Sequence, residues 1–108
     1  MSLLTRHLER FNAGVRSGDF GPMLEQFADG AEMRFEGVPV GPFQGLDAIA
    51  RAYGDQPPDD ELDVLDLRRD GDTFVAGYAW RCEPDRRAGE LRLTVDGALI
   101  TRLVVTFD

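Results

Sequence analysis

The chain has 108 residues, of which 20 are acidic and 12 are basic, so its formal net charge is −8. All 12 basic residues are arginines, so the chain cannot form a lysine Schiff base or a Walker-type phosphate site, both of which need a lysine. With one histidine and one cysteine it cannot form a cysteine or histidine zinc cage or an intrachain disulfide, and it has only two serines. Length and composition therefore indicate a single acidic globular domain over residues 1–108 and leave its reaction open.

The first predicted element is an amphipathic helix over residues 3–18. At ~100° per residue its apolar side chains fall within an arc of about 140°, and polar side chains fill the rest of the circumference. His7 lies inside the apolar stripe, one helical turn before Phe11. Gly18 ends the helix, because glycine readily adopts the left-handed conformation of a C-cap.

A short second helix is expected directly after this cap. Asp19 can serve as its N-cap and Pro22 fits its first turn. Its inward-facing residues would be Met23, Leu24 and Phe27.

The middle of the chain reads as strand, loop and helix. Apolar residues alternate with charged ones over 31–36, which is the period of a half-buried strand. Glycines and prolines interrupt 37–45, so a loop is expected there, and 46–53 reads as a third short helix that ends at Gly54. The prolines at 57–58 favour an extended connector.

The second half is predicted to be a meander of four antiparallel strands. Tight turns are expected at Asp70-Gly71 and Asp96-Gly97, because an Asp-Gly pair accommodates the positive φ angles of a hairpin turn. With the helices that precede them, the strands indicate the α+β class. The predicted strands span 62–69, 73–83, 90–95 and 99–107.

The two faces of this sheet have different expected partners. On the strand 73–83, alternation gives one face Phe74, Ala76, Tyr78, Trp80 and Cys82. Left bare, the apolar residues of the opposite face would form a patch of the kind that usually marks an interface. We therefore predict a homodimer formed through the outer sheet face, which carries Val75, Ala79, Ile100 and Val104.

Several short segments carry a family pattern. Within the opening stretch 8–35 lie Ser17-Gly18-Asp19 and FADGA at 27–31, and later come FQGLDAI at 43–49 and DGALI at 96–100. In this order they resemble the "sGD" turn, the "l..lFaddA" segment, the "f.G.daI" helix entry and the "DGkI" hairpin of the ketosteroid isomerase-like superfamily. This group is also called nuclear-transport-factor-two-like or polyketide-cyclase (SnoaL-like). The resemblance spans almost the whole chain.

The resemblance implies an α+β cone, in which three N-terminal helices pack on a curved, mostly antiparallel β-sheet and the open end forms a small-molecule pocket. Members of the group isomerise steroids, cyclise polyketides, dehydrate substrates or hydrolyse epoxides, and many have no known reaction. Fold alone therefore does not fix function. No metal or organic cofactor is expected.

The resemblance also places hydrocarbons where ketosteroid isomerases keep their catalytic polar groups. The tyrosine position falls on Phe11, the carboxylate base on Phe35 and the protonated aspartic acid on Leu91. A phenylalanine can neither abstract a proton nor donate a hydrogen bond, so this isomerase mechanism is excluded. Glu36 would replace Phe35 only if the register shifted by one residue, since alternation turns Glu36 to the opposite face.

His7 and Tyr53 are the candidate catalytic residues that remain. His7 could act as a general acid or base near physiological pH. Its alternative role is that of a partly buried histidine that closes one end of the core. Tyr53 matches a helix-three tyrosine that supports the oxyanion network of isomerase members, and its alternative role is that of a core residue whose hydroxyl group reaches the rim.

The expected substrate-binding walls are aromatic and aliphatic. They would offer flat apolar surface to a small apolar or ring-bearing molecule, although core packing explains these residues equally well. The residues are Phe11, Phe35, Tyr78, Trp80 and Leu91.

Two further features are interpreted as structural. Cys82 reads as a small buried hydrophobe, because no second histidine or lysine is present to lower its pKa. The acidic run over 55–66 lacks the spacing and the glycine of an EF-hand and reads as solvated charge.

The acidic charge argues against nucleic acid and anionic membranes as partners. No stretch approaches the ~20 apolar residues of a membrane span, and the N-terminus becomes charged too early for a secretory signal. A cytoplasmic location is therefore expected.

Two functions remain open. The first is a small-molecule-binding SnoaL-like protein with an apolar pocket, whose chemistry, where it has any, is of isomerase, cyclase or lyase type. The second is a non-catalytic dimeric binding or accessory domain whose pocket is largely filled by the large side chains of Phe11, Phe35 and Trp80.

Overall fold

A computed structural model describes residues 2–108 of the chain. Within these residues it contains three helices and six strands. In chain order they are α1 (Leu3–Ser17), α2 (Gly21–Leu24), β1 (Phe27–Phe35), β2 (Phe43–Gln44), α3 (Leu46–Asp55), β3 (Leu62–Asp70), β4 (Thr73–Trp80), β5 (Gly89–Asp96) and β6 (Leu99–Val105).

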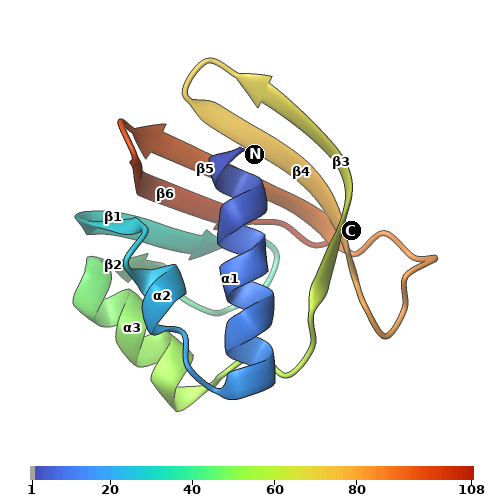
Figure 1. Cartoon of the computed structure of the whole chain (residues 1–108), viewed down its shortest axis with the longest axis horizontal. Coiled ribbons are helices and arrows are strands. Elements are labelled where there is room, and N and C mark those ends of the chain that lie inside the picture. Colours follow the sequence, from blue (N-terminus) through green and yellow to red (C-terminus); the bar gives the residue numbers. More distant parts are fainter. Residues whose placement is uncertain (1) are drawn as a thin grey trace.

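The strands form one open, curved sheet in the order β2-β1-β6-β5-β4-β3. The four strands from β3 to β6 pair as an antiparallel meander, and β1 joins β6 in parallel. Figure 1 shows α1 crossing one face of this sheet, with α2 and α3 packed beside it toward β1 and β2. The predicted α+β fold, with three helices on a curved and mostly antiparallel sheet, is confirmed.

The local signals of α1 act as the sequence indicates. The Ser2 hydroxyl caps the helix by accepting a hydrogen bond from the Thr5 backbone N–H at 3.1 Å. Gly18 ends the helix with a left-handed φ of 81°, and its N–H donates to the Gly14 carbonyl. The middle of the apolar stripe of α1 is buried, and its buried residues are Leu4, His7, Leu8, Phe11 and Gly14.

The second predicted helix is shorter than expected. Phe27 does not belong to it, because it begins β1 and pairs with Ile100 of β6. Asp19 accepts a hydrogen bond from the Gly21 N–H at 2.9 Å, although Phe20 occupies the N-cap position. Burial of the Phe27 ring in the core, where it is 3% exposed, outweighs the weak preference of one helical turn.

The predicted 37–45 loop contains one short strand. Phe43 pairs with Met33 and Gln44 with Glu32, so β2 adds an antiparallel edge to β1. This pairing places the Phe43 ring edge-on against Phe35 at a centroid distance of 6.4 Å. The loop is thereby tied to the sheet.

The outer sheet face differs from its prediction. Ile100 lies in the core and is fully buried. Thr94 of β5 pairs with Arg102 and Val95 pairs with Ile100, so β6 has one extra residue, a β-bulge, between these two pairs. The bulge reverses which side chains of β6 face inward. Val75 and Val104 do face outward but are only 6% and 8% exposed in the single chain. The bare apolar patch expected on this face is therefore absent from the described part of the chain.

Arginine stems explain how these valines are covered. One cross-strand row of the outer face runs Arg34, Val104, Arg92, Val75 and Arg68, from β1 through to β3. Each valine therefore has an arginine on both sides, and the apolar part of a long arginine side chain shields neighbouring hydrocarbon from water.

Cys82 is exposed, which corrects its prediction as a buried residue. The strand β4 ends at Trp80, so the alternation that would have turned Cys82 inward stops before it. Its backbone N–H donates to the Asp60 carboxylate at 3.1 Å. None of the helices in residues 2–108 is long and apolar enough to cross a membrane.

Candidate functional site

The concave side of the sheet holds a cavity of about 220 Å³ that is partly open to solvent. Its floor is made by the inner-face row of the sheet, where Phe35, Val105 and Leu91 are cross-strand neighbours on β1, β6 and β5. Helices α1 and α3 supply the opposite wall through Phe11 and Tyr53. The curvature of the sheet leaves this volume unfilled by side chains.

All seven residues singled out from the sequence contribute to the wall. The apolar and aromatic members are Phe11, Phe35, Tyr78, Trp80 and Leu91. The two proton carriers, His7 and Tyr53, line the same cavity.

Other wall residues were missed by the sequence reading. Leu103 and Val105 share the inward alternation of β6 and could have been included on that signal. Val40 and Gln56 come from connecting segments, which carry no periodicity, so only the tertiary structure brings them to the cavity. Phe107 lies just beyond β6 and stacks on Phe35 at a centroid distance of 6.4 Å.

The three positions that hold polar groups in ketosteroid isomerases are hydrocarbons on the cavity wall. Phe35 lines the cavity, whereas the neighbouring Glu36 is exposed and donates its backbone N–H to the Val105 carbonyl at 2.9 Å. The alternative register, which would have turned Glu36 inward, is therefore wrong. Within residues 2–108 no aspartate, glutamate or arginine lines the cavity.

His7 is held by one side-chain hydrogen bond in a buried position. Its Nδ1 lies 3.1 Å from Oε1 of Gln26, and the ring packs edge-on against Phe27 at 5.4 Å. Burial lowers the pKa of His7 to about 4, with the nearby charge of Arg10 acting in the same direction and the Gln26 hydrogen bond opposing it. The imidazole is therefore neutral at pH 7. Because the amide oxygen of Gln26 can only accept, Nδ1 carries the proton and Nε2 is left as an acceptor.

Tyr53 provides a hydroxyl group with no hydrogen-bond partner in the described part of the chain. Its ring packs on Phe20 at a centroid distance of 5.1 Å. Burial raises the pKa of Tyr53 above its ordinary value, so the hydroxyl stays protonated at physiological pH and can donate a hydrogen bond.

Tyr78 and Trp80 form the wall supplied by β4. Their rings meet nearly perpendicular at a centroid distance of 5.9 Å. The Tyr78 hydroxyl donates to the Thr106 carbonyl at 3.1 Å, so it is occupied by the protein itself. Burial, together with the charge of Asp108, raises the pKa of Tyr78 to about 12. We therefore assign Tyr78 a positioning role in the wall.

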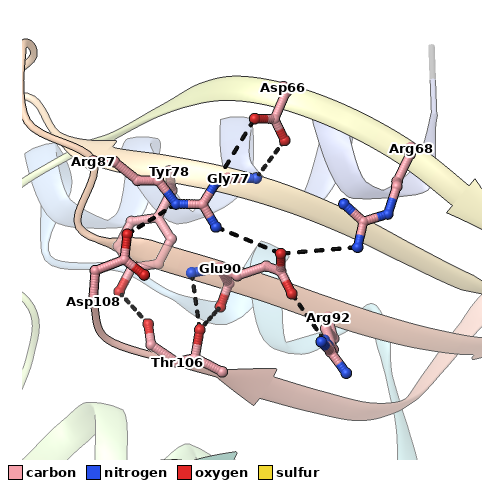
Figure 2. Close-up of polar contacts among 9 residues, drawn as sticks. All are labelled: Asp66, Arg68, Gly77, Tyr78, Arg87, Glu90, Arg92, Thr106 and Asp108. Atoms are coloured by element: carbon pink, nitrogen blue, oxygen red, sulfur yellow. Dashed lines mark hydrogen bonds and ion pairs between the residues drawn. The ribbon is translucent and has the colours of Figure 1, made fainter.

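The segment 106–108 closes one side of the cavity and connects it to the outer face. Figure 2 shows Thr106 bonded to Tyr78 and to Glu90, and Asp108 bonded to Arg87. The Arg87 to Asp108 contact is 2.9 Å long. These bonds fix Phe107 between its neighbours, on the cavity wall.

Several carboxylates of the acidic run 55–66 pair with groups on β4 or just after it. Glu61 and Asp63 form ion pairs with Arg81 at 2.8 and 2.9 Å, and Asp66 accepts the Gly77 backbone N–H at 3.1 Å. Within residues 2–108, no three histidine, cysteine, aspartate or glutamate side chains are grouped as a metal site would require.

Chemically, the cavity combines apolar walls with a few hydrogen-bonding groups. The neutral imidazole of His7 offers an acceptor, and the hydroxyl of Tyr53 offers a donor. Such a site can bind and orient an uncharged molecule, while its described wall residues include no carboxylate that could abstract a proton.

Solved structures share the fold at low sequence identity. A putative polyketide cyclase from Sinorhizobium meliloti has a TM-score of 0.67 and 20% identity, with 97% of this chain and 99% of that chain covered. A putative ketosteroid isomerase from Kribbella flavida has a TM-score of 0.68 and 16% identity, with 95% and 76% covered. A computationally designed 17-OHP binder has a TM-score of 0.76 and 14% identity, with 100% and 92% covered.

Comparison at the sequence level is decisive for the family. A search of curated proteins found no significant match. The family model described as "SnoaL-like domain" matches residues 8–104, which is nearly the whole chain and covers most of α1, most of the sheet and most of the cavity wall, although His7 lies just before the matched range. The chain therefore belongs to the SnoaL-like family.

Proposed function

We propose that this protein binds a small apolar, ring-bearing molecule in the cavity between the helices and the sheet. The observation that carries the proposal is the cavity itself, about 220 Å³ in volume, partly open and walled by aromatic and aliphatic side chains. Ligand pockets commonly measure roughly 300 to 1,000 Å³, so this one suits a compact ligand of one or two rings.

The character of similar proteins agrees with this proposal. Family members include cyclases and isomerases of small molecules, and a protein of the same fold was designed as a 17-OHP binder. The second candidate function, a domain whose pocket is filled by its own side chains, is disfavoured by the empty volume beside Phe11, Phe35 and Trp80.

Binding is better supported than catalysis. A general base works best when its pKa lies near the working pH, whereas the pKa of His7 is about 4. Tyr53 could polarise a ligand carbonyl by donating a hydrogen bond, but the wall residues that the structure describes include no strong base to complete an isomerase, cyclase or lyase step. We therefore assign His7 and Tyr53 to ligand orientation first.

Nuclear magnetic resonance can test the binding function directly. Trp80 is the single tryptophan of the chain, so its indole N–H gives one identifiable signal on the cavity wall. Titration with naphthalene should shift this signal saturably. Ala52→Phe, which adds a ring to the α3 wall, should abolish the shift.

A matched control separates blocking of the cavity from general damage. Ala48→Phe adds the same ring one turn earlier on α3, at a position that does not line the cavity, and should bind naphthalene as the wild type does. If no apolar ring compound shifts the Trp80 signal in the wild type, the proposed function is wrong.

We propose separately that the protein forms a homodimer through the outer sheet face. The valines of this face are covered, so ion-paired arginines and carboxylates would form the contacts with a second copy. The exposed guanidinium groups of Arg34, Arg92 and Arg68 support the proposal, because they lie on this face and can reach acceptors on a second chain. Sedimentation that shows only monomer at micromolar concentration would contradict it.

A further inference from the structure

We propose that His7, oriented by Gln26, recognises a hydrogen-bond donor on the ligand, so that the cavity selects uncharged ring compounds that carry a hydroxyl group. This inference rests on the proposed binding function and adds the chemical class of the ligand. It predicts discrimination both against the same ring without the hydroxyl and against the same ring with a carboxylate.

The first step of the argument is that Gln26 itself is fixed. Its backbone N–H donates to the Met23 carbonyl at 3.1 Å, and its carbonyl accepts from the Ile100 N–H at 2.8 Å. The residue is 5% exposed, so its side chain has little freedom to turn away. Gln26 therefore reaches His7 from a fixed backbone position at the junction between α2 and β1.

The second step concerns the two nitrogens of His7. The amide oxygen of Gln26 accepts from Nδ1–H at 3.1 Å, and this is the only side-chain hydrogen bond of His7 within residues 2–108. A neutral imidazole with its proton on Nδ1 has a lone pair on Nε2. Because His7 lines the cavity and has no second partner, this acceptor is available to a ligand. A hydroxyl group on the ligand supplies the donor that it lacks.

The third step concerns charge. No charged side chain among the described residues lines the cavity, so a carboxylate entering it would lose hydration without gaining a counter-ion. The formal net charge of −8 adds a general repulsion of anions. A hydroxyl group needs only the hydrogen bonds that His7 and Tyr53 offer.

Three probes of one ring size separate these effects, namely naphthalene, 2-naphthol and 2-naphthoate. Each is titrated into nitrogen-15-labelled protein at neutral pH, with the Trp80 indole signal as the reporter. A net hydrogen bond is worth about 0.5 to 1.5 kcal/mol, so 2-naphthol should bind about 2- to 10-fold more tightly than naphthalene. We expect 2-naphthoate to bind at least about tenfold more weakly than 2-naphthol.

Variants of His7 assign the discrimination to this residue. His7→Phe keeps a ring but removes the acceptor, so most of the preference for 2-naphthol over naphthalene should be lost. His7→Gln retains an acceptor oxygen and an N–H for Gln26, and should restore part of the preference. Glu9→Gln, an exposed change two residues along α1, should leave the preference unchanged.

The outcomes distinguish this inference from the proposed function. Equal affinity of the wild type for naphthalene and 2-naphthol would overturn the inference while the binding function stands. A preference for 2-naphthol that survives intact in folded His7→Phe would also overturn it, because another group would then be the acceptor. Failure of every probe to bind would instead contradict the proposed function.

Discussion

The apolar residues on the two faces of the sheet are shielded from water in different ways. The inner face is covered by helices and leaves a cavity beside Phe35 and Leu91. The outer face is covered by its own side chains, with Glu90 at the centre of an ion-pair cluster that reaches Arg92 at 2.9 Å, Arg87 at 3.5 Å and Arg68 at 3.9 Å (Figure 2). Arg92 supplies the bond that most lowers the pKa of Glu90.

This difference shows how burial can arise without an apolar partner. The outward-facing Val75 and Val104 are no more exposed than the inward-facing Val105, yet their covering consists of charged side chains that remain hydrated at their tips. The free energy of unfolding should therefore depend strongly on inner-face residues and weakly on outer-face charges. The following four predictions test that contrast.

The largest expected effect comes from neighbouring residues on opposite faces of β5. Leu93, which is 1% exposed, packs in the core, and Leu93→Ala should lower the free energy of unfolding by about 2 to 5 kcal/mol. Arg92→Met, which keeps a long apolar side chain over the valines and removes only the charge, should cost no more than about 1 kcal/mol, because exposed ion pairs contribute little. Urea unfolding of both variants measures the contrast, and equal losses would refute it.

The pH dependence of stability should carry a contribution from His7. Its pKa is about 4 in the folded chain against 6.5 when unfolded, so the unfolded chain binds more protons between these values. Stability should fall as the pH drops from about 6.5 to 4, by on the order of 3 kcal/mol in total. The loss is complete below the folded pKa and absent above the unfolded one.

Carboxylates also titrate in this pH range, so the contribution of His7 is obtained by subtracting the pH dependence of a variant that lacks the imidazole. His7→Gln removes the titrating group but keeps a hydrogen bond to Gln26. Chemical denaturation of both proteins at several pH values gives the difference curve. Parallel curves for the two proteins would show that His7 is not buried as described.

A smaller effect is expected where the two faces meet, at the segment 106–108. A Cβ on Gly89 would lie 1.9 Å from the Thr106 carbonyl oxygen, so Gly89→Ala must displace this segment and break its bond to Tyr78. We expect a loss of about 1 to 3 kcal/mol and a shifted Trp80 indole signal. Gly30→Ala, where a Cβ meets nothing within 4 Å, is the matched control. If the Trp80 signal does not shift in Gly89→Ala, the segment 106–108 does not influence this part of the cavity wall.

The smallest effect should come from the centre of the ion-pair cluster. Glu90→Gln should cost about 1 kcal/mol or less, and the cost should shrink in about 1 M NaCl because salt screens these pairs. Glu25→Gln, an exposed change outside the ion pairs of the described chain, gives the baseline. A cost that is independent of salt would point to packing rather than charge.

Much of the site was predictable because its walls lie on regular elements. Helical period placed His7 and Phe11 on one stripe, and strand alternation placed Tyr78 and Trp80 on one face. The family pattern placed Tyr53 on the third helix. All of these residues reach the cavity, although their use by a ligand stays a prediction.

Other features could not be predicted, for specific reasons. The bulge on β6 reversed Ile100, because an extra residue resets alternation without a composition signal. The early end of β4 exposed Cys82. Gln26 orients His7 from 19 positions along the chain, and no local pattern links the two.

The sequence by itself determined the fold class, the family and the polarity of the cavity wall, because periodicity and the order of motifs can be read directly along the chain. The tertiary structure decided how much volume stays open, which nitrogen of His7 is free and how the outer valines are covered. These depend on sheet curvature, on a buried contact between α1 and the α2 to β1 junction, and on rows of residues from five strands. Packing between segments that are distant in the sequence sets each of these three features, so no single segment of the sequence could reveal them.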